Sequence, residues 1–350
     1  ALFTPNDQKA DELRKLGFGA VLSHQHDGIA RGTGAFVTLG KGLENELVLE
    51  GEAAAFYSFN KGSSTQSFPS SLMGSIALLR QTYIDADWYK SNAGKIKEYN
   101  LSLDEWNRIQ KFPQIFEAND KLNILRADKI ADEFKVQYII KGGGDEYQRI
   151  SEIKATGAPL IVPVTYPDLY DVEDPFDAQM VDLSQMKHWE MAPSNLYFLS
   201  KNQVPFAITA HGLKDKNSFL NNLKKAYERG ISSSEILKAL TFTPAQLIKQ
   251  ENKIGALKPG MIANFFVAND SLFTDKFTIY ENWIQGKQYI VQPVVVFDIR
   301  GDYDVNIGTG NVYVLKVSGE ENALKASVQL LNDTTFKKDA TISRKENLIS

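Results

Sequence analysis

Short apolar segments alternate with helical segments along residues 112–227, and this alternation constrains the fold more than any other feature of the sequence. The apolar segments lie at residues 114–118, 136–140, 160–164 and 206–209. Stretches with apolar side chains at helical spacing follow three of them. Strands and helices that alternate at this spacing are typical of a parallel sheet or a (β/α) barrel, because each helix returns the chain to start a parallel neighbour.

The segments before residue 112 are also predicted to contain helices and strands, whereas those beyond residue 267 are predicted to be rich in β-structure. Helices are predicted at residues 8–16 and 73–88, and strands at 18–23, 34–39 and 47–59. Beyond residue 267 the apolar residues recur with period two, at 279–283, 289–297, 312–319, 324–332 and 337–345. Period two is the repeat of a β-strand, so the C-terminal part is predicted to be rich in β-structure.

Composition excludes several classes of function. With 350 residues, of which 43% are hydrophobic and 23% charged, the chain has the balance of a globular protein and the length of a barrel-sized domain with an appendage. No run approaches the roughly 18 apolar residues of a membrane-spanning helix. A net charge of −4 offers no basic surface for nucleic acid. The absence of cysteine excludes disulfides and thiolate metal sites, and it is compatible with an oxidising compartment.

Three of the four histidines fall at the ends of predicted strands. His24 and His26 follow the segment 18–23, and His211 follows the last of the four apolar segments. In a barrel the carboxyl ends of the strands form the functional face. Imidazole is a common neutral metal ligand, and Glu117, near the end of its own strand, adds a carboxylate. These four side chains predict a site of three histidines and one carboxylate for a divalent metal, most readily zinc.

Residues 239–269 carry the most specific local pattern. Thr243 is placed to cap a helix that begins at Pro244. A Lys-Pro-Gly turn at 258–260 follows, and then a short apolar strand at 263–267. The order T-x-T-P-A-x-L, followed by I-G-x-L-x-P-G-x-x-A-N-F-x-V, resembles the imidazolonepropionase-like branch of the amidohydrolase superfamily, at the place where the catalytic barrel returns to a small β-sandwich.

This resemblance implies a hydrolase that acts on carbon–nitrogen bonds other than peptide bonds, in which a divalent metal polarises a carbonyl and activates water. Family members place an H-x-H pair after the first barrel strand, Lys or His after the fourth, His after the fifth and sixth, and Asp after the eighth. By this resemblance Glu117 stands at a metal-His position, Lys141 near the next one, and His211 at the position of the Asp. His24 and His26 follow a helix, which makes them residues of the second strand and not the family's metal pair.

Two functions stay open on this basis. The first is an altered metal site that hydrolyses small amides or imides, with His24, His26, Glu117 and His211 as ligands, His211 also as the base, and Lys141 steadying the oxyanion. The second is a non-catalytic barrel whose metal ligands have been replaced, and which serves as a structural or interaction module for a separate catalytic amidohydrolase module. Its partner is then the remainder of the polypeptide or a second copy, bound at the barrel mouth or at unpaired strand edges.

Three further segments carry weaker signals. Residues 31–34 and 142–145 are predicted glycine turns, and the second leads into a helix, where it is either a phosphate cradle or a backbone turn. Neither gives G-x-G-x-x-G, which favours backbone turns that need positive φ over a dinucleotide site. The acidic and aromatic segment 166–189, which contains His188, is predicted either to cover a pocket or bind a partner, or to pack over the barrel mouth.

We therefore expect an α/β fold with three parts. They are a TIM-like (β/α) barrel at residues 1–253 that is incomplete at its N-terminal end, a partial β-sandwich at 254–298 and a β-rich segment at 299–350. The chain opens on a predicted helix, whereas relatives open on strands, which predicts a piece of a longer polypeptide. Resemblance to exported relatives and the lack of cysteine predict a periplasmic or exported location.

Overall fold

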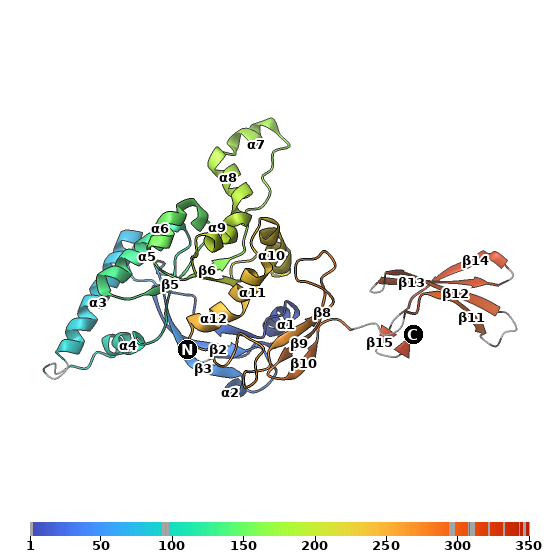
Figure 1. Cartoon of the computed structure of the whole chain (residues 1–350), viewed down its shortest axis with the longest axis horizontal. Helices are drawn as coiled ribbons and strands as arrows, with labels where there is room; N and C mark the ends of the chain where they lie inside the picture. The colour runs from blue at the N-terminus through green and yellow to red at the C-terminus, as the bar shows by residue number, and fades with distance from the viewer. Residues whose placement is uncertain are drawn as a thin grey trace. The chain divides into compact units, whose positions relative to one another are not determined.

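The computed structural model describes residues 3–92, 95, 98–293, 298–306, 308, 312–320, 323–331, 333–342, 344–345 and 348–349. The chain divides into two units, Ala1–Val291 and Gln292–Ser350, and each is described by itself (Figure 1). Residues 294–297, 332 and 343 of the predicted strands lie outside the described residues. The predicted boundaries at residues 253 and 298 stay predictions.

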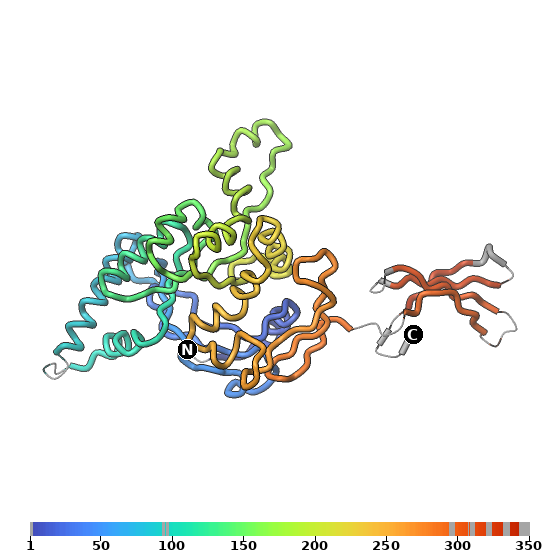
Figure 2. The backbone as a smooth tube through the Cα atoms, viewed as in Figure 1, coloured from blue at the N-terminus to red at the C-terminus, as the bar shows by residue number. Residues whose placement is uncertain are grey.

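A seven-stranded sheet is the framework of the first unit. In spatial order its strands are β1 Ala20–Ser23, β2 Ala30–Thr38, β3 Val48–Ser58, β4 Gln114–Glu117, β5 Tyr138–Lys141, β6 Leu160–Pro163 and β7 Phe206–Thr209. The first three strands pair antiparallel, and each strand from β3 to β7 pairs parallel with the next. The sheet curls (Figure 2), and its mixed α/β architecture is that of an incomplete TIM-like barrel.

The helices of the first unit precede, connect and follow the strands, and several of them cover the large core on one face of the sheet. They are α1 Asp7–Lys15, α2 Glu44–Leu47, α3 Leu72–Ser91, α4 Leu101–Ile109, α5 Lys121–Phe134, η1 Glu146–Arg149, α6 Ile150–Ala155, α7 Pro175–Met180, α8 Leu183–Met191, η2 Ala192–Ser194, α9 Asn195–Lys201, α10 Ser218–Glu228, α11 Ser233–Leu240 and α12 Phe242–Leu247. Several begin at side-chain caps; the carboxylate of Asp120, for example, accepts hydrogen bonds from the first N–H groups of α5. In the described part of the chain, no helix combines the length and the apolar character needed to cross a membrane.

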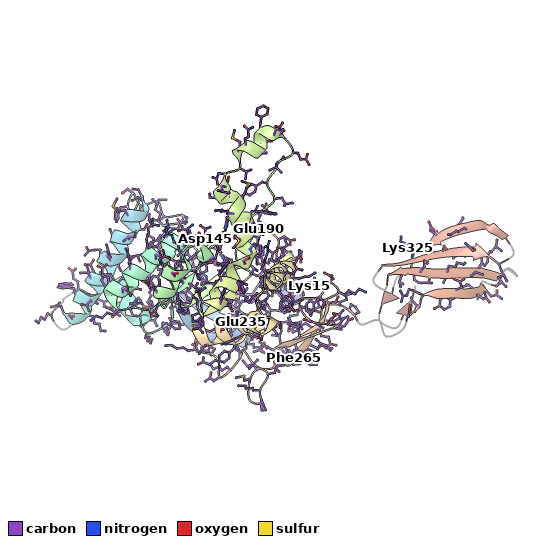
Figure 3. The ribbon with its side chains drawn as sticks, turned by 45° about the horizontal axis from the view of Figure 1, so that its top comes forward. Lys15, Asp145, Glu190, Glu235, Phe265 and Lys325 are labelled. Carbon is purple, nitrogen blue, oxygen red and sulfur yellow. The ribbon has the colours of Figure 1, made fainter. Side chains whose placement is uncertain are left out.

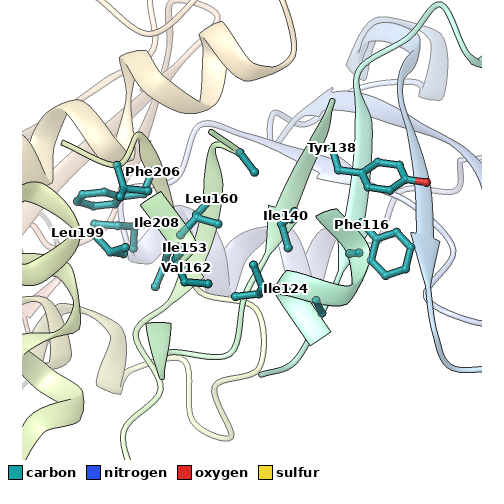
Figure 4. Close-up of a cluster of buried hydrophobic side chains, with 14 of the residues drawn as sticks. Phe116, Ile124, Tyr138, Ile140, Ile153, Leu160, Val162, Leu199, Phe206 and Ile208 are labelled. Atoms are coloured by element: carbon teal, nitrogen blue, oxygen red, sulfur yellow. The ribbon is translucent and has the colours of Figure 1, made fainter. Parts of the chain in front are cut away.

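Side chains alternate between the two faces of the parallel strands, and this alternation positions the site. Phe116, Tyr138 and Ile140 belong to the large core between the sheet and the helices, shown in Figure 4. Ile115 and Ile139 belong to a second, smaller cluster with Ala54 and Phe56. Because strand side chains alternate with period two, Glu117 and Lys141 share the face of Ile115 and Ile139, inside the curl of the sheet.

A three-stranded antiparallel sheet completes the first unit. Its strands lie in the order β10 Lys287–Ile290, β9 Ile279–Ile284 and β8 Phe265–Ala268. Asn282 in β9 joins it to the barrel, because its Nδ2 atom donates to the carbonyl oxygens of Arg14 and Phe18, both at 2.9 Å. Arg14 is itself buried and donates to the carbonyl oxygen of Leu39 at 2.8 Å. The small sheet is therefore anchored to α1 and the start of β1.

The start of α12 differs from the sequence prediction. The helix begins at Phe242, so the prediction that Thr243 caps a helix starting at Pro244 is wrong. The reason is that α11 ends at Leu240, one residue before the N-cap position at Thr241. The hydroxyl group of Thr241 donates to the carbonyl oxygen of Leu237 and closes α11, and Thr243 is buried.

The segment between β6 and β7 carries an arm, defined here as residues 168–191 and containing α7 and α8. The arm projects from the rest of the first unit (Figures 1 and 3). Neither of its helices contains a buried residue, and the side chains of Phe176 and Met180 are 75% and 82% exposed. At its base the hydroxyl group of Tyr147 hydrogen-bonds to Nδ1 of His188 at 3.0 Å.

The second unit consists of antiparallel strands. β11 Gly301–Asn306, β12 Val312–Glu320, β13 Ala323–Leu330 and β14 Asp333–Ala340 form one sheet in this order, and β15 Arg344–Lys345 pairs with β16 Leu348–Ile349. Val317 and Ala326, which are register partners on β12 and β13, are its buried apolar residues among those described.

Candidate functional site

The register of the parallel strands brings polar side chains together at their carboxyl ends. Ser58 at the end of β3 is the register partner of Glu117 on β4, and Glu117 is the partner of Lys141 on β5. The Nζ atom of Lys141 donates to Oε1 of Glu117 at 3.0 Å and to Oδ1 of Asn119 at 3.3 Å. Glu117 and Lys141 are the last residues of β4 and β5, which are four residues long. The two side chains therefore lie at the carboxyl end of the sheet.

Arg31 on β2 completes the arrangement from the opposite side. Its Nη1 atom donates to Oε2 of Glu117 at 2.5 Å, and its Nε atom donates to the carbonyl oxygen of Gly28 at 3.0 Å. The Arg31 side chain is 5% exposed and that of Glu117 17%. Arg31, Glu117 and Lys141, here called the ion-pair triad, therefore place one carboxylate between two cations.

The triad holds Glu117 ionised. Burial of Glu117 opposes ionisation, but the hydrogen bond from Arg31 and the positive charge of Lys141 outweigh it and lower the pKa of the carboxyl group to about 2. Both carboxylate oxygens accept a charge-assisted hydrogen bond, which is the strong form of this contact.

The histidines form a second group beside the triad. The ring of His24 stacks on Phe56 with centroids 3.7 Å apart, and the His24 and His26 rings lie 4.0 Å apart. His26 stacks in turn on His211, at 4.7 Å and an interplanar angle of 9°. Gly34 on β2 makes room for this histidine row, since a Cβ atom there would lie 2.5 Å from the Phe56 ring and 2.8 Å from Cβ of His24.

The histidine row, defined as His24, His26 and His211, is neutral at pH 7. Burial lowers the pKa of His24 to about 4, and it lowers the pKa values of His26 and His211 as well; the charge of Lys141 adds to the effect at His211. The Nδ1 atom of His24 lies 2.8 Å from the carbonyl oxygen of Gln25, which can only accept, so Nδ1 carries the proton and Nε2 does not.

A pocket of about 440 Å³ opens between the triad and the histidine row. Its lining residues are His26, Arg31, Ser58, Phe59, Asn60, Leu72, Glu117, Ala118, Asn119, Asn123 and His211. The volume lies within the usual range of small-molecule sites. Three residues predicted from the sequence, His26, Glu117 and His211, thus face a common pocket.

The arrangement does not fit a divalent metal. Among the described residues, no three histidine, aspartate or glutamate side chains are grouped so that they could hold an ion. Glu117 is the one carboxylate that lines the pocket, and both of its oxygens already accept from cations. The predicted roles of His24, His26, Glu117 and His211 as ligands, and of Lys141 and His211 in catalysis, stay predictions.

Arg31 is the main site residue that the sequence does not reveal, because the Arg-Gly-Thr-Gly pattern predicts a turn. Residues 31–34 lie within strand β2, so that prediction is wrong. The signal in the sequence is a charged residue within a β-strand, at a position whose side chain faces the inside of the curled sheet. Residues 142–145 do form a loop, and a Cβ atom on Gly143 would lie 2.1 Å from the carbonyl oxygen of Asn119, so close backbone packing accounts for a glycine there.

No protein-family model matches the chain, and no curated protein matches its sequence. A solved amidohydrolase from Thermotoga maritima is 20% identical, with a TM-score of 0.67 over 81% of this chain and 75% of its own. A Xaa-Pro dipeptidase with methionine in its active site (14% identity, 54% and 47% coverage, TM-score 0.41) and an adenosine deaminase from Xanthomonas campestris with bound zinc (14%, 70% and 62%, TM-score 0.33) match too weakly to establish a common fold. The chain therefore shares the fold of an amidohydrolase.

Proposed function

We propose that this chain is an amidohydrolase-type barrel that acts as a binding and interaction module and performs no metal-dependent hydrolysis. The observation that supports this proposal is the ion-pair triad, in which Arg31 and Lys141 occupy both oxygens of Glu117. By the sequence resemblance, Glu117 stands where the family has a metal ligand. In this chain its carboxylate has a different partner on each side.

Electrostatics favours the triad over a metal at this position. Two unit charges about 4 Å apart interact by about 4 kcal/mol at an effective dielectric constant of 20, so a divalent ion beside either cation meets about twice that repulsion. The neutral histidine row supplies no negative charge to offset it. Removal of Arg31 and Lys141 from Glu117 would leave two cations without a partner, which is costly for side chains as enclosed as that of Arg31.

A metal-dependent hydrolase of small amides or imides is the second candidate. One observation favours it, namely that His26, Glu117 and His211 line the same pocket. In this function His24, His26, Glu117 and His211 would hold a zinc ion, which would supply polarisation of a carbonyl group, while His211 would also serve as the base and Lys141 would steady the oxyanion. It requires Glu117 to exchange its two cations for the metal.

An interaction module of this type needs a protein partner. We propose the remainder of a longer polypeptide, or a second copy of the chain, as that partner, with a catalytic amidohydrolase module elsewhere in the assembly. A periplasmic or exported location is part of the same proposal and is based on the resemblance to exported relatives.

Metal content distinguishes the two functions. The full chain, purified without a metal-binding tag, is incubated with excess zinc, passed through a desalting column and measured by elemental mass spectrometry. We expect less than about 0.1 zinc per chain, unchanged in the His211→Ala variant. The matched control is His188→Ala, which removes the one histidine outside the histidine row. About one zinc per chain that is lost in His211→Ala and kept in His188→Ala would overturn the proposal in favour of the hydrolase.

A further inference from the structure

Asn60 and Asn119, two of the three asparagines that line the pocket, present hydrogen-bond donors because their oxygens already accept hydrogen bonds. Oδ1 of Asn60 accepts from the N–H of Gly62 at 2.9 Å, and Oδ1 of Asn119 accepts from Lys141. These contacts fix the orientation of both amides, because a backbone N–H or an ammonium group can only donate. Within the described residues, each Nδ2 group is left without a hydrogen-bond acceptor.

Arg31 adds the third donor group. Nε and Nη1 are engaged with Gly28 and Glu117, and Nη2 has no acceptor in the part of the chain that the structure describes. Arg31 also lines the pocket. Free guanidinium and amide N–H groups on one wall match a ligand that offers acceptor oxygens.

The local charge is +1. Arg31 and Lys141 contribute two positive charges and Glu117 one negative charge. The carboxylates of Asp27 and Asp120 do not line the pocket: Asp27 accepts from Ser63 and is attracted by the charge of Arg31, and Asp120 caps α5 and accepts from Asn123. A ligand with a single negative charge would therefore neutralise the net charge of the ion-pair triad, whereas a dianion would leave an excess negative charge.

Other lining residues are suited to an apolar or planar group. Phe59, Leu72 and Ala118 line the pocket together with the rings of His26 and His211. The two imidazole rings stack on each other at 9°, so one face of each ring is covered by the other and the rest of each ring is available to the pocket. Such a wall stabilises a ligand by burial of apolar area, at about 25 cal/mol for each Å².

We propose that this pocket binds a small organic monocarboxylate, with its carboxylate on Arg31, Asn60 and Asn119 and its apolar or planar body against Phe59, Leu72, His26 and His211. The inference rests on the proposed function, since it requires that no metal ion takes the place of Arg31 and Lys141 beside Glu117, and it adds the class of ligand that the module binds. The pocket volume of about 440 Å³ limits the ligand to a small molecule.

The test compares benzoate with its neutral isostere benzamide. Isothermal titration calorimetry is performed on the full chain at pH 7 in the presence of a chelator, so that no metal contributes. We expect benzoate to bind at least tenfold more tightly than benzamide. Sulfate, which is a dianion at this pH, is expected to bind more weakly than benzoate.

Two substitutions of opposite sign identify the site. Arg31→Gln lowers the local charge to zero and is expected to weaken benzoate binding at least tenfold, whereas Glu117→Gln raises it to +2 and is expected to tighten binding. Arg80→Gln, which removes an exposed arginine on α3 paired with Glu133, is the control and is expected to change nothing. Near-ultraviolet circular dichroism checks that each variant is folded.

Equal binding of benzoate and benzamide, or unchanged benzoate affinity in a folded Arg31→Gln variant, would overturn the inference. Should Arg31→Gln fail to fold, weakened benzoate binding in Glu117→Gln overturns it instead. The two proposals fail separately: zinc uptake contradicts the proposed function, while loss of the benzoate preference under chelation contradicts the inference alone.

Discussion

Gly143 shows how one missing side chain fixes the geometry of the pocket. A Cβ atom at this position would lie 2.1 Å from the carbonyl oxygen of Asn119, which is backbone and cannot rotate away. The loops that follow β4 and β5 therefore touch, and Asn119 is held at the pocket wall.

Gly143→Ala is accordingly expected to destabilise the protein by about 2 kcal/mol, the middle of the range for overpacking, and to weaken any ligand of the pocket. Urea denaturation followed by circular dichroism measures the free energy of unfolding. Gly51→Ala is the matched control, because a Cβ atom at Gly51 in β3 meets no atom within 4 Å. Equal stability of the two variants would contradict the expected clash.

At the residue scale, the sequence located some members of the site and missed others for a physical reason. Glu117 and Lys141 end strands, and His24, His26 and His211 follow strands; strand ends can be recognised from apolar patterns. The structure brings Glu117 next to Lys141, and the three histidines next to one another. What no local pattern encodes is that an arginine from a distant strand reaches Glu117, since that contact depends on the curl of the sheet.

Asp128 on α5 provides a prediction at the scale of one element. Burial raises the pKa of this carboxyl group to about 6, and the negative charge of Asp132 one turn later adds to the rise. A folded-state pKa above the ordinary value of 3.8 means that ionisation disfavours the folded state. The helix is therefore less stable at pH 7 than at pH 4, and the loss occurs as the pH rises through about 6.

Asp128→Asn is expected to stabilise the protein at pH 7 by about 1 kcal/mol. The rise in the pKa of Asp128 corresponds to roughly 3 kcal/mol, and solvent screening of this half-exposed group reduces that value. The gain shrinks towards zero as the pH falls to 4. Differential scanning calorimetry at both values measures the change in Tm. Asp87→Asn, at an exposed aspartate on α3, is the control and should show no gain at either pH. A gain for Asp128→Asn that persists unchanged at pH 4 would contradict burial of the charge as its cause.

At the element scale, the parallel strands were the most predictable part of the fold. The segment 206–209 coincides with β7, and 114–118 exceeds β4 by one residue. These strands are buried on both faces, so their apolar runs are continuous and bounded by polar residues. β2 was predicted to begin at residue 34 but begins at Ala30, because two glycines interrupt its apolar pattern. The position of the arm could not be predicted, because its apolar side chains, such as those of Phe176 and Met180, are exposed, and a sequence pattern does not distinguish them from buried core residues.

The whole molecule consists of two units with separate cores. Ala1–Val291 contains the large cluster around the parallel strands, and Gln292–Ser350 buries Val317 and Ala326 within its own sheet. We expect a chain that ends at Val291 to keep the Tm of the first unit within about 2 °C, because each core is completed inside its own unit. Scanning calorimetry of the full and shortened chains measures this, and a lower Tm of the shortened chain would show that the second unit stabilises the first.

The histidine row gives the protein an internal spectroscopic probe. Aromatic rings at centroid distances of 3.7 to 4.7 Å shield each other's protons, so the imidazole resonances of His24, His26 and His211 should be displaced by ring currents. His188, the one remaining imidazole, lies on the arm and serves as the reference. With four histidines in the chain, a one-dimensional proton spectrum resolves each of them. Any molecule that enters the pocket must shift the resonances of His26 and His211 and leave that of His188 in place.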